Sequence, residues 1–360
     1  MGMMAFDFFC GAGGLTRGLL DAGIKVIAGF DNDEKCRQSY ERNNAPARFV
    51  RADIRDLSIA DLKEYAKGTD LGEMLFAGCA PCQPFSQQLK NSECRHDATL
   101  LSEFGRLVEA ALPGQVLMEN VPGIARVRGN STFRRFLRIL AENGYHYVYG
   151  VVDAKQFGVP QKRRRLILIA LRHTQPSMPP AKHGAGVLPF RTVRQAISHF
   201  PPIAEGEVHS EMPNHVAASI TPLNLDRLRH TPPDGGDRRS WPKSLRLDCH
   251  TGNYEGHTDV YGRMAWDAPA PTLTGRCHSL SNGRYGHPTQ DRAISLREAA
   301  ALQSFPDGYV FSGSNKHIAQ QIGNAVPVRL AEAMGRHIRM LVQEPKACGT
   351  SPQEIRVDPA

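Results

Sequence analysis

The sequence predicts an α/β protein: a Rossmann-like sheet with helices on both faces, and a smaller, loop-rich second domain. Up to about residue 173, short apolar segments alternate with helix-like segments, which is typical of a mainly parallel sheet. The first apolar segment runs into a glycine-rich turn and then a helix, an arrangement that brings the backbone close to a nucleotide-like cofactor. From residue 174 the chain is rich in proline, histidine and glycine, and no long helical periodicity remains.

We therefore expect four parts along the chain. Residues 1–173 form the domain that carries the glycine-rich turn, and residues 174–294 form the smaller, loop-rich domain. Residues 295–343 supply a helix and then return the chain to the first domain. Residues 344–360 are polar, contain three prolines and are expected to be a disordered tail.

The composition indicates a globular protein with an anionic partner. The chain has 360 residues, of which 41% are hydrophobic and 22% charged, and its formal net charge is +8. This positive charge favours nucleic acid as the partner. Eight cysteines are scattered along the chain, as expected for reduced thiols. There is no secretion signal and no apolar run long enough to cross a membrane, so we expect a cytoplasmic protein.

The first three expected strands carry candidate cofactor contacts. The second strand ends at Asp31, about 20 residues after the glycine turn, where a carboxylate can accept hydrogen bonds from ribose hydroxyls. The third ends at Asp53, which is a candidate for binding an adenine amino group. These features alone permit NAD, FAD or S-adenosylmethionine. Thr16 occupies the third glycine position of a dinucleotide fingerprint, which argues against a pyrophosphate-binding turn.

Cys82 is the candidate nucleophile. The apolar run 71–77 is expected to be a buried strand, and it leads into a turn in which Pro81 and Pro84 bracket Cys82. Such a turn holds the cysteine at the sheet edge where α/β proteins bind ligands. The alternatives are a buried structural thiol, or a redox or zinc role for the pair Cys79 and Cys82. A zinc site would require a second close pair of ligands, which the sequence lacks.

Two further segments supply candidate catalytic groups. Glu119 follows the expected strand 115–118, and an acid at such a strand end suits proton transfer. A run of five donor side chains precedes a later strand, and alternation places Gln161, Arg163 and Arg165 on one face of it. The simpler interpretations are a capping acid and a solvent-exposed basic patch.

Arginines on glycine-rich loops of the second domain are candidate DNA contacts, because arginine binds both phosphates and guanine edges. They are Arg238, Arg239, Arg276 and Arg284. Structural loops of similar composition are the alternative interpretation. Near the C-terminus, residues 295–303 and 328–341 are expected to be helices, separated by a Gly-Asn-Ala-Val-Pro segment at 323–327.

Six segments in order resemble the DNA (cytosine-5)-methyltransferases of the compact prokaryotic type, which occur in restriction–modification systems or alone. These segments are residues 9–14, 81–83, 119–121, 161–165, 297–306 and 323–327. Each is modestly specific by itself, whereas all six at family-like spacing are very specific. Residues 175–265 and the tail lie outside the resemblance.

The resemblance implies S-adenosylmethionine as the cofactor, double-stranded DNA as the substrate and no metal. A cytosine is flipped out of the duplex and methylated at C5. The Cys82 thiolate attacks C6 of the cytosine. Glu119, protonated or hydrogen-bonded at N3, offsets the charge that builds up in the ring. Arg165 binds the cytosine O2 and holds Glu119, and Arg163 supports this network of contacts.

The resemblance also implies the role of each part of the chain. Residues 1–173 are the catalytic and cofactor-binding domain, residues 174–294 are the target-recognition domain, and the helix after residue 295 organises that recognition domain. It implies binding residues as well. The implied cofactor contacts are Phe9, Gly11, Ala12, Gly13, Gly14, Asp31, Asn32, Asp53, Ile54, Pro81, Leu100, Asn324 and Ala325. A loop that closes over the base adds three residues to the four arginines as DNA contacts: Ser86, Gln88 and Arg95. We expect a monomer, and the sequence leaves open whether a cognate restriction endonuclease is encoded separately.

Three alternative functions remain, one with the same chemistry and two from other classes. A tRNA cytosine-5 methyltransferase would keep the chemistry, but the large basic second domain favours DNA. A non-catalytic DNA-binding regulator is disfavoured by the intact candidate residues Cys82, Glu119, Arg163 and Arg165. A nicotinamide-dependent oxidoreductase is disfavoured by the broken dinucleotide fingerprint and by the proline-flanked cysteine.

Overall fold

The computed structural model describes residues 2–81, 100–126, 131–247, 259–344 and 354–357. By its internal contacts the chain divides into two compact units. The first unit comprises residues 1–157, 164–181 and 326–360, and the second comprises residues 158–163 and 182–325.

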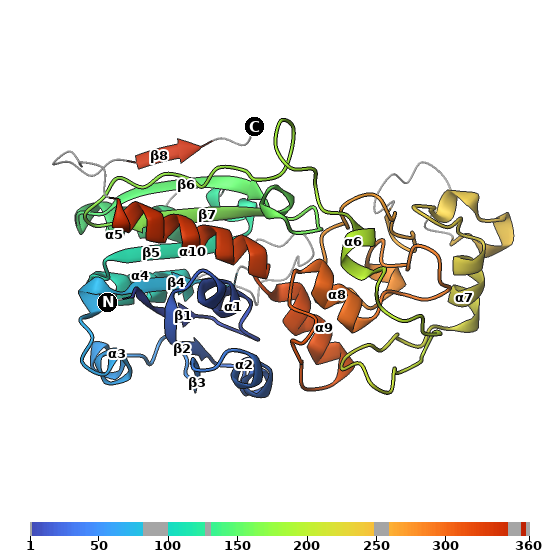
Figure 1. Cartoon of the computed structure of the whole chain (residues 1–360), viewed down its shortest axis with the longest axis horizontal. Helices are drawn as coiled ribbons and strands as arrows, with labels where there is room; N and C mark the ends of the chain where they lie inside the picture. The colour runs from blue at the N-terminus through green and yellow to red at the C-terminus, as the bar shows by residue number, and fades with distance from the viewer. Residues whose placement is uncertain (1, 82–99, 127–130, 248–258, 345–353, 358–360) are drawn as a thin grey trace. The chain divides into compact units, whose positions relative to one another are not determined.

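The first unit contains an eight-stranded sheet in the order β3-β2-β1-β4-β5-β7-β6-β8 (Figure 1). The strands are β1 (Met4–Phe8), β2 (Lys25–Asp31), β3 (Arg48–Arg51), β4 (Leu75–Gly78), β5 (Gln115–Asn120), β6 (His146–Asp153), β7 (Arg164–Leu171) and β8 (Glu354–Val357). Strands β1 to β5 pair in parallel, whereas β7 runs antiparallel to both β5 and β6. The predicted α/β fold is confirmed, and the carboxyl ends of the five parallel strands share one edge of the sheet.

Helices cover both faces of this sheet. Those of the first unit are α1 (Gly14–Asp21), α2 (Arg37–Asn43), α3 (Ile59–Ala66), α4 (Leu100–Ala111), α5 (Thr132–Glu142) and α10 (Val328–Gln343). In β1, Phe6 and Phe8 point into an apolar core that they share with α3, α4 and α5. Asp7 lies between them and points to the opposite face, where its carboxylate accepts a hydrogen bond from Thr16 of α1.

Helices α1 and α10 lie side by side (Figure 1) and approach each other closely at Gly18. A Cβ atom at Gly18 would lie 2.4 Å from the Ala331 Cβ and 2.5 Å from the Val328 carbonyl oxygen. Only glycine allows this approach, so helix α10 packs directly against helix α1.

The second unit contains the helices α6 (Val193–Ile197), α7 (Pro222–Arg229), α8 (Leu296–Leu302) and α9 (Asn315–Asn324). Its described residues form isolated β-bridges and no strand of the sheet. Buried arginines supply many of the hydrogen bonds that its loops require. The guanidinium of Arg263 donates to four main-chain carbonyls, those of Leu228, Thr231, His287 and Gln290.

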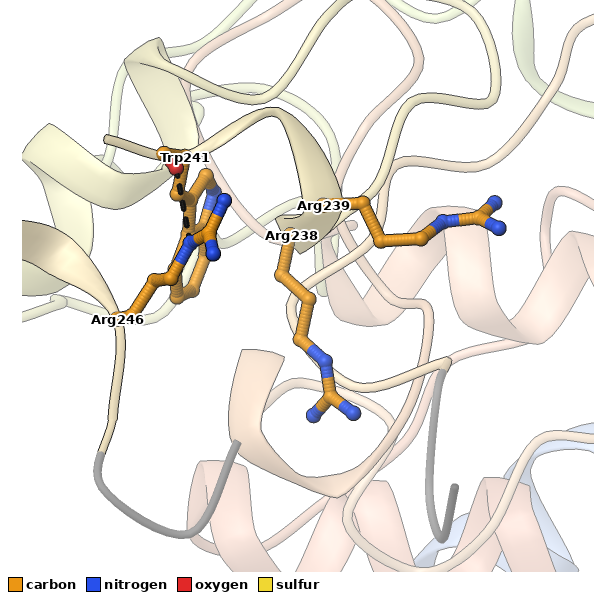
Figure 2. Close-up of a pocket in the computed structure, with 4 residues that line it drawn as sticks. All are labelled: Arg238, Arg239, Trp241 and Arg246. Atoms are coloured by element: carbon orange, nitrogen blue, oxygen red, sulfur yellow. Dashed lines mark hydrogen bonds between the residues drawn. The ribbon is translucent and has the colours of Figure 1, made fainter. Parts of the chain in front are cut away.

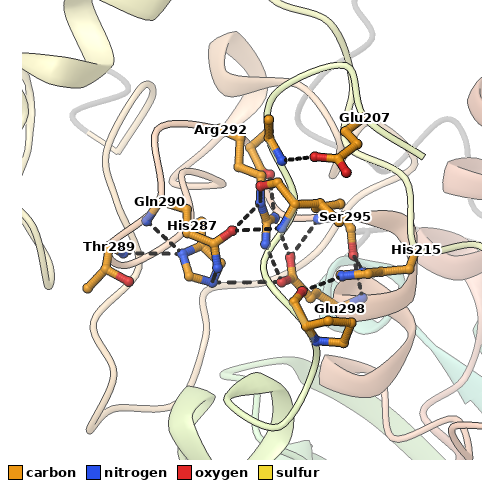
Figure 3. A network of polar contacts seen from close by, with 12 residues as sticks. Glu207, His215, His287, Thr289, Gln290, Arg292, Ser295 and Glu298 are labelled. Atoms are coloured by element: carbon orange, nitrogen blue, oxygen red, sulfur yellow. Dashed lines mark hydrogen bonds and ion pairs between the residues drawn. The ribbon is translucent and has the colours of Figure 1, made fainter. Parts of the chain in front are cut away.

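A buried polar network surrounds the start of α8 (Figure 3). The Ser295 hydroxyl accepts from the Glu298 N–H, and the Glu298 carboxylate accepts from the Ser295 N–H, so the two form a capping box. Arg292 donates to both oxygens of Glu298 at 2.7 Å. The Nδ1 of His287 accepts from the main-chain N–H groups of Thr289 and Gln290, and burial lowers the pKa of His287 to about 4. This histidine is therefore neutral at physiological pH.

Short 3-10 helices complete both units. They are η1 (Glu34–Cys36), η2 (Leu71–Glu73), η6 (Pro122–Arg126), η7 (Ala154–Phe157), η8 (Arg238–Ser240), η9 (Lys243–Leu245) and η11 (Leu280–Asn282). The prediction of one strand over residues 71–77 was wrong in its first half. The Asp70 side chain accepts from the Gly72 N–H and caps η2, so the strand starts only at Leu75.

The C-terminal segment also differs from expectation. We predicted a disordered tail over residues 344–360, but residues 354–357 form β8, which pairs in parallel with β6. An edge strand such as β6 presents unpaired main-chain groups, and β8 satisfies some of them. The remaining residues after 344 lie outside the described part of the chain.

Candidate active site

The turn between β1 and α1 forms a main-chain cradle at the carboxyl edge of the sheet. Phe9, Gly11 and Gly13 have φ angles of 62°, 51° and 90°, which curl the backbone into a tight turn. The Gly11 N–H donates to the Asp31 carboxylate at 2.8 Å, and the Asp33 N–H donates to the other oxygen at the same distance. No atom lies within 4 Å of a Cβ built on Gly11, so the space above the turn is open.

This cradle fits the expected cofactor in its main features. Burial raises the pKa of Asp31, while the two main-chain donors act in the opposite direction. Ala12, Gly13, Gly14 and Ile54 are buried, whereas Asn32 and Pro81 are exposed. Leu100 begins α4. These positions suit a nucleotide-like ligand held by main-chain groups rather than by a large set of charges.

One predicted cofactor contact has another partner, and two others belong to the second unit. We expected Asp53 to bind adenine, but its carboxylate pairs with the Arg55 guanidinium, with the Nε 2.8 Å from Oδ1. The pKa of Asp53 is lowered by this hydrogen bond. Asn324 and Ala325 belong to the second unit, where Asn324 ends α9 and is exposed.

Beneath the cradle, Asp7 carries a raised pKa. Its side chain is fully buried on β1, and burial raises the pKa to about 7. One oxygen accepts from the Thr16 hydroxyl at 2.6 Å, and that hydroxyl also contacts the Tyr40 hydroxyl at 2.9 Å. The other oxygen, Oδ1, has no hydrogen-bond partner.

Glu119 lies at the carboxyl end of β5, inside the strand rather than after it as we predicted. Its carboxylate is only 4% exposed and has a donor on each oxygen. The Nε of Arg165 lies 2.8 Å from Oε1, and the Sγ of Cys79 lies 2.7 Å from Oε2. The structure therefore brings Glu119 and Arg165 together. The candidate nucleophile Cys82 lies outside the described residues.

The predicted alternation over residues 161–165 is present: Gln161 and Arg163 are buried and Arg165 is nearly so, while Lys162 and Arg164 are exposed. Arg163 has partners of its own in the second unit. Its guanidinium donates to the main-chain carbonyls of Leu273, Gly323 and Ala325 in the second unit, at 2.7 to 3.2 Å. These contacts join the loop at Leu273 to the C-terminal end of α9. The supporting role of Arg163 at the flipped base stays a prediction.

Among the predicted DNA contacts, Arg239 and Arg276 are exposed. Arg284 donates to the main-chain carbonyls of Gly235, Gly236 and Arg263, and Arg238 is buried. A guanidinium that donates to three carbonyls stabilises these loops, and the DNA contact of Arg284 stays a prediction. The three predicted contacts on the closing loop, Ser86, Gln88 and Arg95, lie outside the described residues.

A cavity of about 140 Å³ on the second unit is lined by Arg238, Arg239, Trp241 and Arg246 (Figure 2). Figure 2 shows Arg246 lying against Trp241, whose carbonyl accepts from the Arg246 Nε at 3.2 Å. The side chains of Arg238 and Arg239 extend in different directions. The cavity is lined by three arginines, and their positive charge suits an anion such as a phosphate.

The sequence analysis missed two functional candidates. Arg246 escaped notice because it lies outside any glycine-rich loop. Cys79 was considered only as part of a Cys-x-x-Cys pair, although a signal for its contact was available. It directly follows β4, and β4 pairs with β5 so that Gly78 lies opposite Met118; Cys79 is therefore opposite Glu119.

Comparisons with known proteins show the family of this chain. The model of the family described as "C-5 cytosine-specific DNA methylase" matches residues 3–340. The chain is 39% identical over 342 residues to the Type II methylase M.HgiDII of Herpetosiphon aurantiacus, covering 94% of this chain and 95% of that protein. It is 30% identical over 346 residues to the Type II methyltransferase M.Eco47II of Escherichia coli, covering 94% and 79%.

A solved structure shows the same fold. The crystal structure of the S. pombe Dnmt2 methyltransferase superposes with a TM-score of 0.61 at 17% identity, covering 95% of this chain and 99% of that one. A methyltransferase fold with a cofactor cradle beside a buried acid thus defines the class of protein. The chain belongs to the C-5 cytosine-specific DNA methylase family. It is a DNA (cytosine-5)-methyltransferase, and its cofactor is S-adenosylmethionine. In the described parts of the chain, no helix combines the length and the apolar character needed to span a membrane.

Proposed function

We propose that this enzyme methylates C5 of a cytosine flipped out of double-stranded DNA, within one short recurring sequence. Cys82, Glu119 and Arg165 act together on the flipped base. The observation that carries the proposal is the Glu119 carboxylate. It is buried at the end of β5 and held by the Arg165 Nε at 2.8 Å, next to the strand that leads into Cys82.

The proposed chemistry uses each group for one task. The Cys82 thiolate forms a bond to C6, and the displaced electron pair of the C5–C6 double bond makes C5 nucleophilic. Glu119 stabilises the charge that develops in the ring by sharing a proton with N3. Arg165 neutralises charge at the cytosine O2 and fixes the orientation of Glu119. After methyl transfer, a base removes the C5 proton, the C5–C6 double bond re-forms and the Cys82 sulfur leaves.

The turn at 9–14 and the strand end at Asp31 are proposed to hold the cofactor. The open space above Gly11, the main-chain donors and the buried carboxylate support this assignment. When bound, S-adenosylmethionine supplies an electrophilic methyl group. Asn324 and Ala325 stay predictions as further contacts of the same ligand.

The second unit is proposed to read the DNA. The exposed Arg239 and Arg276 and the arginine-lined cavity with Arg246 support phosphate contacts there. The curated relatives are named as Type II methyltransferases, which favours DNA over tRNA. We further propose that the enzyme acts as a monomer on chromosomal DNA and protects it from a separately encoded endonuclease.

Methyl transfer from labelled S-adenosylmethionine to plasmid DNA, with total tRNA in parallel, tests the proposal. We expect label in DNA only, and base-resolution mapping should place 5-methylcytosine in one recurring short sequence. A Cys82→Ser variant should fold and bind the cofactor but lose turnover, because a hydroxyl is a weak nucleophile at neutral pH.

Label confined to tRNA would overturn the proposed substrate while leaving the catalytic roles standing. Unchanged turnover in Cys82→Ser would overturn the covalent mechanism. Cofactor binding without label in either nucleic acid would favour a DNA-binding regulator.

A further inference from the structure

Cys79 is placed to act on the catalytic acid rather than to fill the core. It is half-buried and free of any disulfide, and its Sγ lies 2.7 Å from the Glu119 Oε2. Two negatively charged atoms would repel at this distance, so a proton lies between them. The thiol is therefore a hydrogen-bond donor to the carboxylate.

The backbone around Cys79 is held on both sides. The Cys79 N–H donates to the Phe8 carbonyl at 3.3 Å, which ties the residue to β1. The next carbonyl, that of Ala80, accepts from the Asn120 side chain at 3.0 Å. These two bonds connect three adjacent strands at the sheet edge. The thiol is thus presented to Glu119 from a fixed position.

Glu119 has three rotatable side-chain bonds, so a single partner would leave its carboxylate free to turn. Arg165 holds Oε1 and Cys79 holds Oε2, and together they define the plane of the group. Each carboxylate oxygen can accept more than one hydrogen bond, so both keep acceptor capacity for a base. Such pre-organisation lowers the cost of orienting the acid at the moment of reaction.

We propose that Cys79 is a positioning residue for the methyl-transfer reaction: its thiol fixes the orientation of Glu119. This inference rests on the proposed role of Glu119 and adds the sulfur that holds it. Cys79, the first cysteine of the Cys-x-x-Cys pair, then serves as a hydrogen-bond donor and not as a redox centre or a zinc ligand.

The test uses the full-length variants Cys79→Ala and Cys79→Ser. Alanine removes the donor, whereas serine keeps one on a shorter arm. Two rates are measured: single-turnover methylation of DNA, and cofactor-free release of tritium from C5-labelled cytosine, which reports addition of the nucleophile alone. Thermal midpoints and the dissociation constants for S-adenosylmethionine and DNA are measured alongside.

We expect Cys79→Ala to lower both rates about tenfold or more, the effect of losing one hydrogen bond to a charged group. Its midpoint should stay close to the wild-type value, and both dissociation constants should stay within about twofold, since the binding residues are untouched. Cys79→Ser should recover most of the lost rate.

A wild-type rate in Cys79→Ala would overturn the proposal. An equal loss in both variants would also overturn it, since that pattern indicates packing of the sulfur rather than donation by it. Failure of the proposed function is seen separately, because the wild-type enzyme would then release no tritium and methylate no DNA.

Discussion

Glu119 is buried between two donors, and this environment determines what its substitution should do. In Glu119→Gln the amide oxygen can still accept from Arg165, so the fold should be kept. The amide cannot share a proton with cytosine N3, and we expect the single-turnover rate to fall by about 10²- to 10⁴-fold. Binding of S-adenosylmethionine, measured by calorimetry, should be unchanged. A loss of less than tenfold would contradict the role of Glu119 as the catalytic acid.

Asp7 predicts a pH dependence of stability in the first unit. Its pKa is raised to about 7 by burial, so between about pH 4 and pH 7 the folded state holds a proton that the unfolded state has lost. The free energy of unfolding therefore falls as pH rises through this window, by about 1.4 kcal/mol per pH unit from this group. Below pH 4 the contribution is fully present, and above pH 7 it is lost.

Asp7→Asn should remove this contribution, because the amide stays neutral at every pH. Denaturant titrations followed by circular dichroism at pH 5 and pH 8 measure the difference. We expect the stability of the variant relative to wild type to increase from pH 5 to pH 8. A constant difference between the two proteins would show that Asp7 does not titrate in this range.

At the level of elements, apolar periodicity and capping residues predicted several limits well. Strand β2 ends at Asp31 as predicted, and helices α8 and α10 lie within two residues of their predicted limits. Helix α3 was not foreseen, although Ser58 and Asp61 form a capping box that signals its start. The antiparallel pairing of β7 with β5 depends on long-range contacts that periodicity does not record.

In the candidate site, too, the locally marked features could be predicted and the long-range contacts could not. Glu119, Arg165 and the glycine turn are marked by strand ends and loop chemistry, and the sequence was sufficient to single them out. Arg163 and Arg284 donate to main-chain carbonyls that lie more than twenty residues away in the sequence. A charged residue looks the same in sequence whether it faces solvent, DNA or a buried carbonyl, so these contacts required the structure.

The capping box of α8 contains a buried ion pair, and we predict that Glu298→Gln strongly destabilises the second unit. Burial alone would raise the pKa of Glu298, but the hydrogen bonds and charge of Arg292 outweigh it and the pKa is lowered. Removing the carboxylate leaves the Arg292 charge buried without its counterion, which costs about 3–5 kcal/mol. Both tryptophans of the chain, Trp241 and Trp266, lie in this unit, so tryptophan fluorescence during urea unfolding measures the loss.

Asp267→Asn is the matched control. Asp267 also accepts two hydrogen bonds from one arginine, Arg194, at 2.7 and 2.8 Å, but the pair is exposed. Exposed pairs contribute about 0–1 kcal/mol, so this variant should unfold close to wild type. Equal effects of the two substitutions would contradict the importance of burial at α8.

Across the whole molecule, the net charge of +8 does not translate directly into DNA contacts. In the second unit Arg163, Arg263, Arg284 and Arg292 are engaged with main-chain carbonyls or with a buried carboxylate. A unit with no extended sheet in its described residues has many loop carbonyls to satisfy, and a guanidinium with five N–H donors satisfies several at once. We therefore expect the exposed arginines to supply the DNA contacts.

The difference between exposed arginines and arginines engaged inside the protein predicts how salt should affect DNA binding. Each phosphate contact releases counterions, so losing one lowers the slope of log affinity against log salt by about 0.9. Arg239 is 87% exposed and pairs only locally with Asp237, and Arg276 is exposed. We therefore expect Arg239→Ala and Arg276→Ala each to reduce the slope by about one, for cognate and non-cognate duplexes alike, with S-adenosylmethionine affinity unchanged.

Arg336→Ala is the control for that measurement, because Arg336 is an exposed arginine on α10 of the first unit that pairs with Glu332. Fluorescence anisotropy titrations of a labelled duplex at several salt concentrations give the slopes. The control should keep the wild-type slope, since its charge lies outside the unit proposed to read DNA. If all three variants lose the same amount, the positive charge acts through the net charge of the protein. If only Arg239→Ala and Arg276→Ala lower the slope, the phosphate contacts lie on the second unit. If a variant instead binds cognate and non-cognate duplexes equally well, its arginine contacts a base edge.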